Sequence, residues 1–258
     1  MKILFLADVF GVPGRRAVEE HLPGLRERYD ADLTIVNGEN AADGAGITPK
    51  LADKLLAAGA DVVTLGNHTY RRGGIAAYLA ASERVIRPAN SGAEAPGRGT
   101  AVVEARNGVE VAVLNLLGQL FLPTPVSPWE MVDALVEEAR AAAPVVILDF
   151  HAEATSEKVA LATWLDGRVT AVIGTHTHIQ TNDARILPGG TAAISDAGMT
   201  GPHDSVIGVK SDLAIARMRT RLPVRFEPAE GDVRLEGVLV RCTDGGRAEA
   251  IELVRVSA

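Results

Sequence analysis

The chain has 258 residues, of which 47% are hydrophobic, so it can bury a sizeable core and disorder is not indicated. A net charge of −7 argues against a protein that coats nucleic-acid backbones, because that task needs a basic stripe. The single cysteine, Cys242, excludes an internal disulfide and a cysteine-based zinc site, and it fits a reducing, cytoplasmic setting. We expect no secretory signal, and no apolar run approaches the length of a membrane span.

Hydrophobic runs alternate with helical patterns through the first two-thirds of the chain, which is typical of a largely parallel sheet covered by helices. The expected strands are residues 2–7, 32–37, 61–65, 145–150 and 169–174. The expected helices are residues 15–29, 49–58, 128–142 and 155–165. Pro13 opens the first helix, and Pro23 should kink or split it. Thr48 and Pro49 provide the cap and first turn of the second helix.

The later part of the chain indicates antiparallel strands. Residues 100–105 and 109–116 flank Asn107-Gly108, which is the strongest short signal for a β-hairpin. Beyond residue 185 the pattern predicts short strands that form an antiparallel closing section, at residues 224–226, 233–242 and 248–256. No linker, repeat or low-complexity segment interrupts the chain. We therefore expect residues 1–258 to form one α/β domain.

Histidines and carboxylates follow several of the expected strands. Six of them lie just past a hydrophobic run: Asp8, Glu39, His68, His151, His176 and His178. Side chains from several strand ends converge at one rim of an α/β sheet, where metal ions and substrates are usually held. The pattern therefore predicts a metal site whose ligands are spread over the sequence.

Together with Asn67, these residues form a mixed oxygen and nitrogen ligand set without thiolate, which suits iron, manganese or zinc. His176 and His178 are two apart, so their rings point to the same side of an extended segment. One metal rarely needs so many ligands, whereas two metals that share a bridging carboxylate use them naturally. Such a pair polarises a phosphoryl group and lowers the pKa of a bridging water to give hydroxide, so phosphoester hydrolysis is the expected reaction class. The ions would also supply the positive charge that an anionic substrate needs.

His68 directly follows Asn67, so we expect it to lie close to the metals without binding them and to protonate the leaving alkoxide. A single strand-end histidine is more often structural than a ligand, but four of them with matching acids reverse that preference. His203 has no spacing partner and is expected at the surface or in a substrate loop. Arg71 and Arg72 could meet a substrate phosphate, although exposed arginines after a turn usually contact only water.

Several blocks of the sequence resemble the metal-site motifs of the calcineurin-like metallophosphoesterases: Asp8, Asn67-His68, His151 and Gly174-x-His176-x-His178. Three further segments resemble the YmdB-like bacterial branch of that superfamily, and the resemblance spans nearly the whole chain; they are residues 5–11, 37–40 and 198–202. The wider superfamily usually has histidine where Phe10 stands and aspartate where Glu39 stands. Both departures are typical of the YmdB-like branch.

The resemblance implies the calcineurin-like metallophosphoesterase fold, in which mixed β-sheets pack together and are flanked by helices. It implies a first metal ion held by Asp8, Glu39, Asn40 and His178. It implies a second ion held by Glu39, Asn67, His151 and His176, so that Glu39 is the bridge. Asn40 can join Glu39 only if the backbone turns after Gly38, because adjacent residues of an extended chain point to opposite faces. Iron or manganese is expected at both positions, with zinc as the alternative.

The activity implied by the resemblance is hydrolysis of small cyclic nucleotides, of the 2′,3′-cyclic and also the 3′,5′-cyclic type. One alternative is a phosphomonoesterase or nucleotidase with the same metal centre. Another is a regulatory module that binds metal and recognises a nucleotide or a protein with little turnover. Retention of His68, which a pure binding module would not need, favours an enzyme. We expect no extended nucleic acid and no membrane as partners, and the sequence leaves a homo-oligomer and the physiological substrate open.

Overall fold

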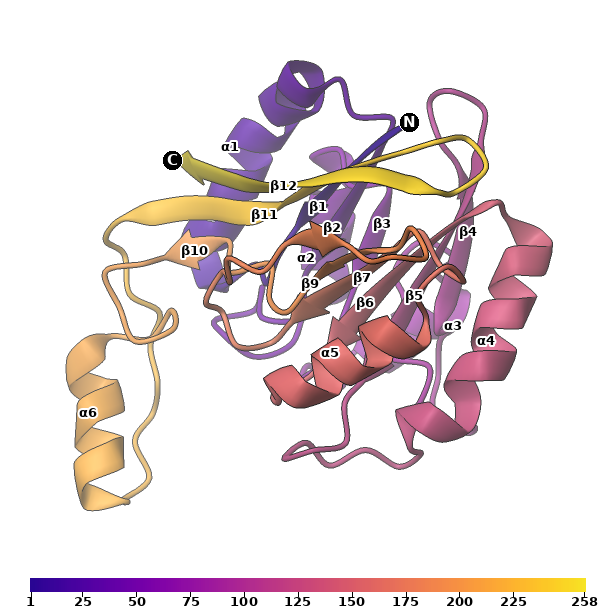
Figure 1. The fold of residues 1–258 in the computed structure, drawn as a ribbon. Helices are drawn as coiled ribbons and strands as arrows, with labels where there is room; N and C mark the ends of the chain where they lie inside the picture. The colour runs from indigo at the N-terminus through magenta and orange to yellow at the C-terminus, as the bar shows by residue number, and fades with distance from the viewer.

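Two β-sheets lie face to face at the centre of the computed structural model, which describes residues 1–258 (Figure 1). The first sheet has the order β10-β11-β1-β2-β3, with β12 paired to β11. Its strands are β1 (Lys2–Leu6), β2 (Leu33–Asn37), β3 (Val62–Thr64), β10 (Gly201–Pro202), β11 (Val233–Cys242) and β12 (Ala248–Ser257). β1, β2 and β3 are parallel, whereas β11 runs antiparallel to β1 and to β12.

The second sheet has the order β4-β5-β6-β7-β9-β8. Its strands are β4 (Thr100–Glu104), β5 (Glu110–Leu117), β6 (Val145–His151), β7 (Ala171–Thr175), β8 (Arg185–Ile186) and β9 (Ala192–Ile194). β5, β6, β7 and β9 are parallel neighbours. β4 pairs antiparallel with β5 across Asn107-Gly108, and Gly108 adopts φ 83°, so the predicted hairpin is confirmed.

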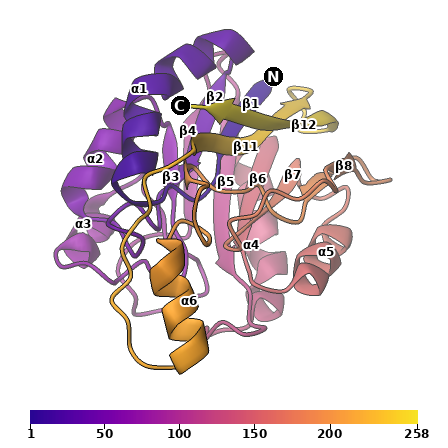
Figure 2. The same cartoon turned by 90° about the vertical axis from the view of Figure 1, so that its left-hand side faces the viewer.

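Helices cover the outer faces of both sheets (Figure 2). The first sheet is covered by α1 (Gly11–Tyr29), α2 (Pro49–Ala57) and α3 (Ile75–Ala81), and the second by α4 (Pro128–Ala142) and α5 (Thr155–Trp164). The core between the sheets is formed by inward-facing side chains that include Ile3, Phe5, Ile35, Val113 and Ile147. The expected α/β fold of packed mixed sheets flanked by helices is therefore confirmed. None of the helices is both long enough and apolar enough to cross a bilayer.

The first helix differs from its prediction at two points. It begins at Gly11 rather than near residue 15, and it continues through Pro23 without a break. Pro13 therefore lies in the first turn, where its missing N–H group has no helical partner to lose. Pro23 lies on the exposed side of α1, so the carbonyl group that it leaves unpaired faces water. Of the expected kink or split at Pro23, the split is therefore wrong.

A helical arm leaves the sandwich between β10 and β11. It consists of α6 (Ser211–Thr220) and the irregular segment that returns from it, and it projects away from the sheets (Figure 1). The sequence predicted a strand at residues 224–226, and this was wrong because those residues belong to the irregular segment. α6 and α3 were not predicted. Only Ala214 of α6 is buried, so the helix carries no apolar stripe of helical period.

A buried ion pair joins α5 to the segment that follows β9. Lys158 Nζ lies 2.8 Å from Asp196 Oδ2, and the two side chains are only 2% and 1% exposed. We expect Lys158→Met to lower the free energy of unfolding by about 3–5 kcal/mol, because it leaves a buried carboxylate without its cation. Urea unfolding would measure the change.

The exposed pair Lys210–Glu227 offers a matched control, since Lys210→Met removes a lysine whose side chain is 45% exposed. We expect this variant to unfold at nearly the same urea concentration as the unaltered protein. Equal losses in Lys158→Met and Lys210→Met would contradict a structural role of the buried pair. The double variant Lys158→Met/Asp196→Asn should recover part of the loss, because it removes the stranded charge.

Candidate metal centre

The chain segments at the carboxyl ends of five strands meet at one edge of the two sheets. β1, β2 and β3 supply them from the first sheet, and β6 and β7 from the second. The eight residues of interest lie at these strand ends: Asp8, Glu39, Asn40, Asn67, His68, His151, His176 and His178. Every one of them is buried or half-buried. The fold thus brings together all the residues that the sequence singled out for metal or proton chemistry.

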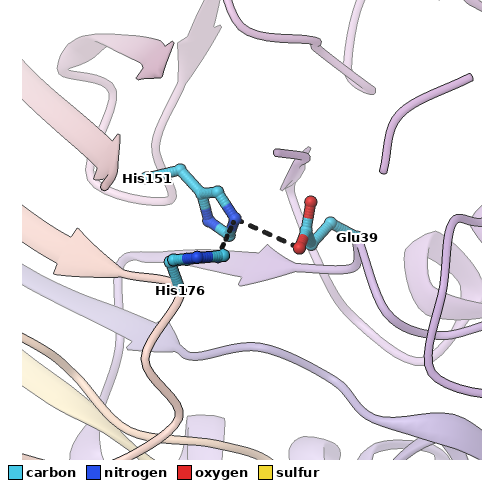
Figure 3. Close-up of side chains that lie close together, drawn as sticks. All are labelled: Glu39, His151 and His176. Atoms are coloured by element: carbon cyan, nitrogen blue, oxygen red, sulfur yellow. Dashed lines mark hydrogen bonds and ion pairs between the residues drawn. The ribbon is translucent and has the colours of Figure 1, made fainter. Parts of the chain in front are cut away.

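Glu39, His151 and His176 form the tightest cluster, with one ligand atom from each lying within 4.8 Å of the others (Figure 3). His151 Nε2 is 3.1 Å from Glu39 Oε1 and 3.1 Å from His176 Nδ1. Asn67 Oδ1 lies 3.0 Å from the same Nε2 atom. We call these four residues the His151 group. Their carboxylate, amide and imidazole atoms could hold a metal ion.

A second set of side chains lies on the other side of Glu39. Asn40 Nδ2 is 3.1 Å from His178 Nε2 and 3.2 Å from Glu39 Oε1. Asp8 Oδ1 is 3.9 Å from His178 Nε2. We call Asp8, Asn40 and His178 the His178 group. Glu39 is thus a member of the His151 group that also contacts the His178 group, through Asn40. The backbone turns directly after Gly38, so Asn40 reaches the same space as Glu39.

One oxygen of this site has no partner in the protein. Asp8 is fully buried, and its Oδ2 accepts the backbone N–H of His176, whereas Oδ1 makes no hydrogen bond. Burial raises the pKa of Asp8 well above its ordinary value; His151 opposes this rise, while Asp196 and Glu39 add to it. A buried acceptor without a donor is rare and costly. A cation beside Oδ1 would satisfy it, so the residues present fit a metal ion.

The ring of His151 is oriented by a chain of buried hydrogen bonds. Thr175 Oγ1 donates to Asp149 Oδ1 at 2.7 Å, so its hydroxyl proton is already engaged. The 2.9 Å contact between Thr175 Oγ1 and His151 Nδ1 must then have the imidazole as donor. This leaves Nε2 to face Glu39 and His176, as a ligand nitrogen must.

Glu39 and His151 perturb each other strongly. Burial is the largest single influence and lowers the pKa of His151. The charge and hydrogen bond of Glu39, with the charges of Asp8 and Asp149, together outweigh it and raise the pKa to about 9. Burial likewise raises the pKa of Glu39, but the charges and hydrogen bonds of His151 and His68 hold it well below its ordinary value. A metal ion at this cluster therefore competes with a proton for Nε2.

His176 and His178 do not lie in an extended segment, contrary to the prediction. They adopt φ values of 100° and 64°, a left-handed conformation that is strained for residues other than glycine. The strained turn is held by Thr177, whose N–H and hydroxyl both donate to Asp196 Oδ2. As a result the two rings separate, His176 toward Glu39 and His151, and His178 toward Asn40.

The second ring nitrogen of each of these histidines also contacts a group of the protein. His176 Nε2 lies 3.0 Å from Glu153 Oε2, and His178 Nδ1 donates to the carbonyl of Ile207 at 2.9 Å. No role was predicted for Glu153, Thr175 or Asp149. Only Asp149 could have been found from the sequence. It stands two residues before His151 and therefore faces the same side of β6.

His68 lies beside the cluster. Its backbone N–H donates to Glu39 Oε2 at 3.0 Å, and its Nδ1 is 2.8 Å from Asn40 Oδ1 and 3.4 Å from Glu39 Oε1. The side chain is 26% exposed, more than Glu39. The imidazole therefore contacts residues of both groups and also reaches solvent.

A cavity of about 680 Å³ opens above the two groups and is lined by His68, His176 and His178. Arg71 and Arg72 line it too, but Arg72 is bound to the carbonyls of Ala42 and Ala45, whereas Arg71 is exposed. The volume is in the range of sites for small molecules. His203 contacts the carbonyl of Met199 and lies outside the lining.

The chain is similar to known proteins over nearly its whole length. A 2′,3′-cyclic-nucleotide 2′-phosphodiesterase from Bacillus subtilis (strain 168) is 47% identical over 256 residues, covering 99% of this chain and 96% of that protein. The crystal structure of a hypothetical protein from Thermus thermophilus superposes with a TM-score of 0.93 at 42% identity, covering 100% of this chain and 99% of the other.

The crystal structure of a novel phosphatase from Mycoplasma pneumoniae gives a TM-score of 0.90 at 34% identity, over 100% of this chain and 93% of the other. The family model described as YmdB-like protein matches residues 4–254. The resemblance seen in the sequence motifs is therefore confirmed, and the chain belongs to the YmdB-like protein family.

Proposed function

We propose that the protein is a dinuclear-metal phosphodiesterase that hydrolyses small cyclic nucleotides. The observation that carries the proposal is the position of Glu39, a fully buried carboxylate that contacts His151 within its own group and Asn40 of the His178 group. A carboxylate shared in this way suits the bridge of a two-metal site. The name of the Bacillus subtilis relative supports 2′,3′-cyclic nucleotides as the substrate class, and the same chemistry extends to 3′,5′-cyclic nucleotides.

The assignment of ligands follows the two groups of side chains. One ion would be held by Asp8, Glu39, Asn40 and His178, and the unpartnered Oδ1 of Asp8 supports this position. The other ion would be held by Glu39, Asn67, His151 and His176, and the orientation of His151 by Thr175 supports it. The mixture of carboxylate, amide and imidazole favours iron or manganese, with zinc as the alternative.

When bound, the two ions polarise the phosphoryl group and lower the pKa of a water molecule. His68 moves the proton that the leaving oxygen needs. The contact of its Nδ1 with Asn40 Oδ1 identifies Nδ1 as the donor in that hydrogen bond and leaves Nε2 for the exchangeable proton.

Three further features belong to the proposal. A single domain over residues 1–258 is supported by the shared core between the sheets, to which both halves of the chain contribute. A cytoplasmic location is supported by the single cysteine, Cys242, which is buried as a free thiol. The substrate is a small phosphodiester, since the cavity above the two groups has the volume of a small-molecule site.

The test of the proposal is turnover of 2′,3′-cyclic, 3′,5′-cyclic and monoester nucleotides with added manganese or iron. We expect hydrolysis of the cyclic diesters and little of the monoesters. Preferential hydrolysis of monoesters would favour the phosphomonoesterase or nucleotidase alternative. Metal and nucleotide binding without turnover of any of the three would favour the regulatory module.

Glu39→Gln should abolish turnover and lower the occupancy of both metal positions, because a neutral amide replaces the shared charge. Metal analysis of the purified variant, together with the turnover assay, would measure both effects. Glu138→Gln, on the exposed face of α4, is the matched control. A Glu39→Gln protein with normal metal content and rate would contradict the bridging role.

His68→Ala should slow turnover by roughly 10²–10⁴-fold, the usual contribution of a general acid. Metal occupancy should stay near that of the unaltered protein, because His68 is assigned to neither ion. The comparison variant is His21→Ala on α1, away from the site. Loss of metal from His68→Ala would mean that His68 is a ligand rather than the proton donor.

Thr175→Val keeps the shape of the side chain but removes the acceptor for His151 Nδ1–H. We expect about 10–100-fold weaker metal affinity, the usual effect of losing a partner that orients a ligand. Competition with a chelator would measure it. Thr163→Val is the control, since that hydroxyl bonds the carbonyl of Val159 on the exposed side of α5. Equal affinities in the two variants would show that His151 does not depend on Thr175.

A further inference from the structure

The cavity above the metal-site residues continues to the helical arm. Its lining includes Arg217 from α6 and Phe226 from the returning segment, as well as His68 and His176. The chain has five phenylalanines, and two of them, Phe10 and Phe226, line this one cavity. An aromatic wall and the candidate metal centre therefore share one cavity.

The two phenylalanines differ in their exposure to solvent. Phe10 is only 4% exposed, and its ring packs edge-on against His178 with the centroids 5.5 Å apart. Phe226 is 42% exposed and contacts the guanidinium of Arg217, whose central carbon lies 5.0 Å from the ring centroid. Phe10 is thus a packing residue behind a candidate ligand, whereas Phe226 presents ring surface to solvent.

The arm is anchored at its base, beside the cavity. Lys210 Nζ lies 2.7 Å from Glu227 Oε2, and Val209 forms an isolated bridge with Pro228. Glu227, Pro228 and Val209 also line the cavity. These contacts hold Phe226 next to the site although the tip of α6 projects away from the sheets (Figure 2).

Phe226 and Arg217 have the chemistry that recognises a flat aromatic ring. Bases stack on aromatic side chains with little dependence on sequence, because every base has a π-face. An arginine guanidinium beside the ring adds a cation–π contribution. The metal-site residues, in contrast, offer nothing that recognises a base, since they are ligands for cations and phosphate.

We propose that Phe226 and Arg217 form the nucleobase subsite of this cavity, which rests on the proposed cyclic-nucleotide phosphodiesterase function. The base of the substrate stacks on the Phe226–Arg217 pair while its phosphodiester lies at the His151 and His178 groups. The subsite distinguishes nucleoside phosphodiesters from phosphodiesters that lack a base. It tolerates both purines and pyrimidines, because stacking does not read hydrogen-bonding edges.

The experiment compares 2′,3′-cyclic AMP with methyl riboside 2′,3′-cyclic phosphate, which has the same cyclic diester and no base. The measured quantity is the ratio of the two kcat/KM values. We expect this ratio to fall about tenfold in Phe226→Ala, which corresponds to about 1.4 kcal/mol and lies within the range of one stacked base. Phe226→Trp should restore the preference for the base.

Met218→Ala is the matched control, because Met218 lies on the same arm, is 72% exposed and does not line the cavity. It should leave the ratio as it is in the unaltered protein. A ratio that is also unchanged in Phe226→Ala would overturn the subsite. A change of oligomeric state in that variant with the same ratio would overturn it too, and would identify the arm as a docking element.

Calorimetric binding of the same two compounds separates this inference from the proposed function. If the unaltered protein turned over neither compound and no 3′,5′-cyclic nucleotide, the phosphodiesterase function would be wrong. The subsite would still be supported by tighter binding of 2′,3′-cyclic AMP that is lost in Phe226→Ala. Equal binding of both compounds by the unaltered protein would overturn the subsite, whatever the turnover.

Discussion

The site depends on the hydrogen bonds that the buried carboxylate of Asp149 accepts. It accepts hydrogen bonds from Asn37 and Thr64 of the first sheet and from Thr175 of the second, at 2.9, 2.6 and 2.7 Å. A buried carboxylate needs several such donors, so the two sheets are locked together at the ends of their strands. Two of these donors also position candidate metal ligands. Asn37 Oδ1 accepts the backbone N–H of Glu39, and Thr175 orients the ring of His151.

Most strands of the two central sheets could be predicted because hydrophobic runs and turn residues mark them directly, as in the hairpin around Asn107-Gly108, whereas the short strands β8, β9 and β10 were not placed. The arm could not be predicted. α6 buries only Ala214, so packing leaves no periodic pattern in its sequence. Residues 224–226 were predicted as a strand, but they have no strand to pair with. Elements that depend on a few contacts with the rest of the fold leave weak signals in the sequence.

The residues brought together at the site were predictable because each follows a strand and matches a motif. The arrangement of these residues in space was not predictable. The left-handed conformations of His176 and His178 cannot be foreseen at residues that carry a Cβ, and they depend on Thr177 and Asp196 from different parts of the fold. Glu153 was not predictable for a related reason, since acidic residues are common in loops and its partner His176 is set only by the fold.

The charge distribution explains how an acidic protein could bind an anion. The chain carries a net charge of −7, and its centre contains the buried carboxylates of Asp8, Glu39 and Asp149. Burial raises the pKa of Asp8 well above its ordinary value, partly countered by His151 and reinforced by Asp196 and Glu39, so this centre is electrostatically costly as long as it holds no cation. The carboxylates that would repel a phosphodiester are therefore the groups that concentrate the cations needed to attract it. Arg71 and Arg217 line the same cavity. Under the proposed function they would meet a substrate whose charge is already balanced at the centre, so binding at the outer wall would depend on stacking rather than on charge.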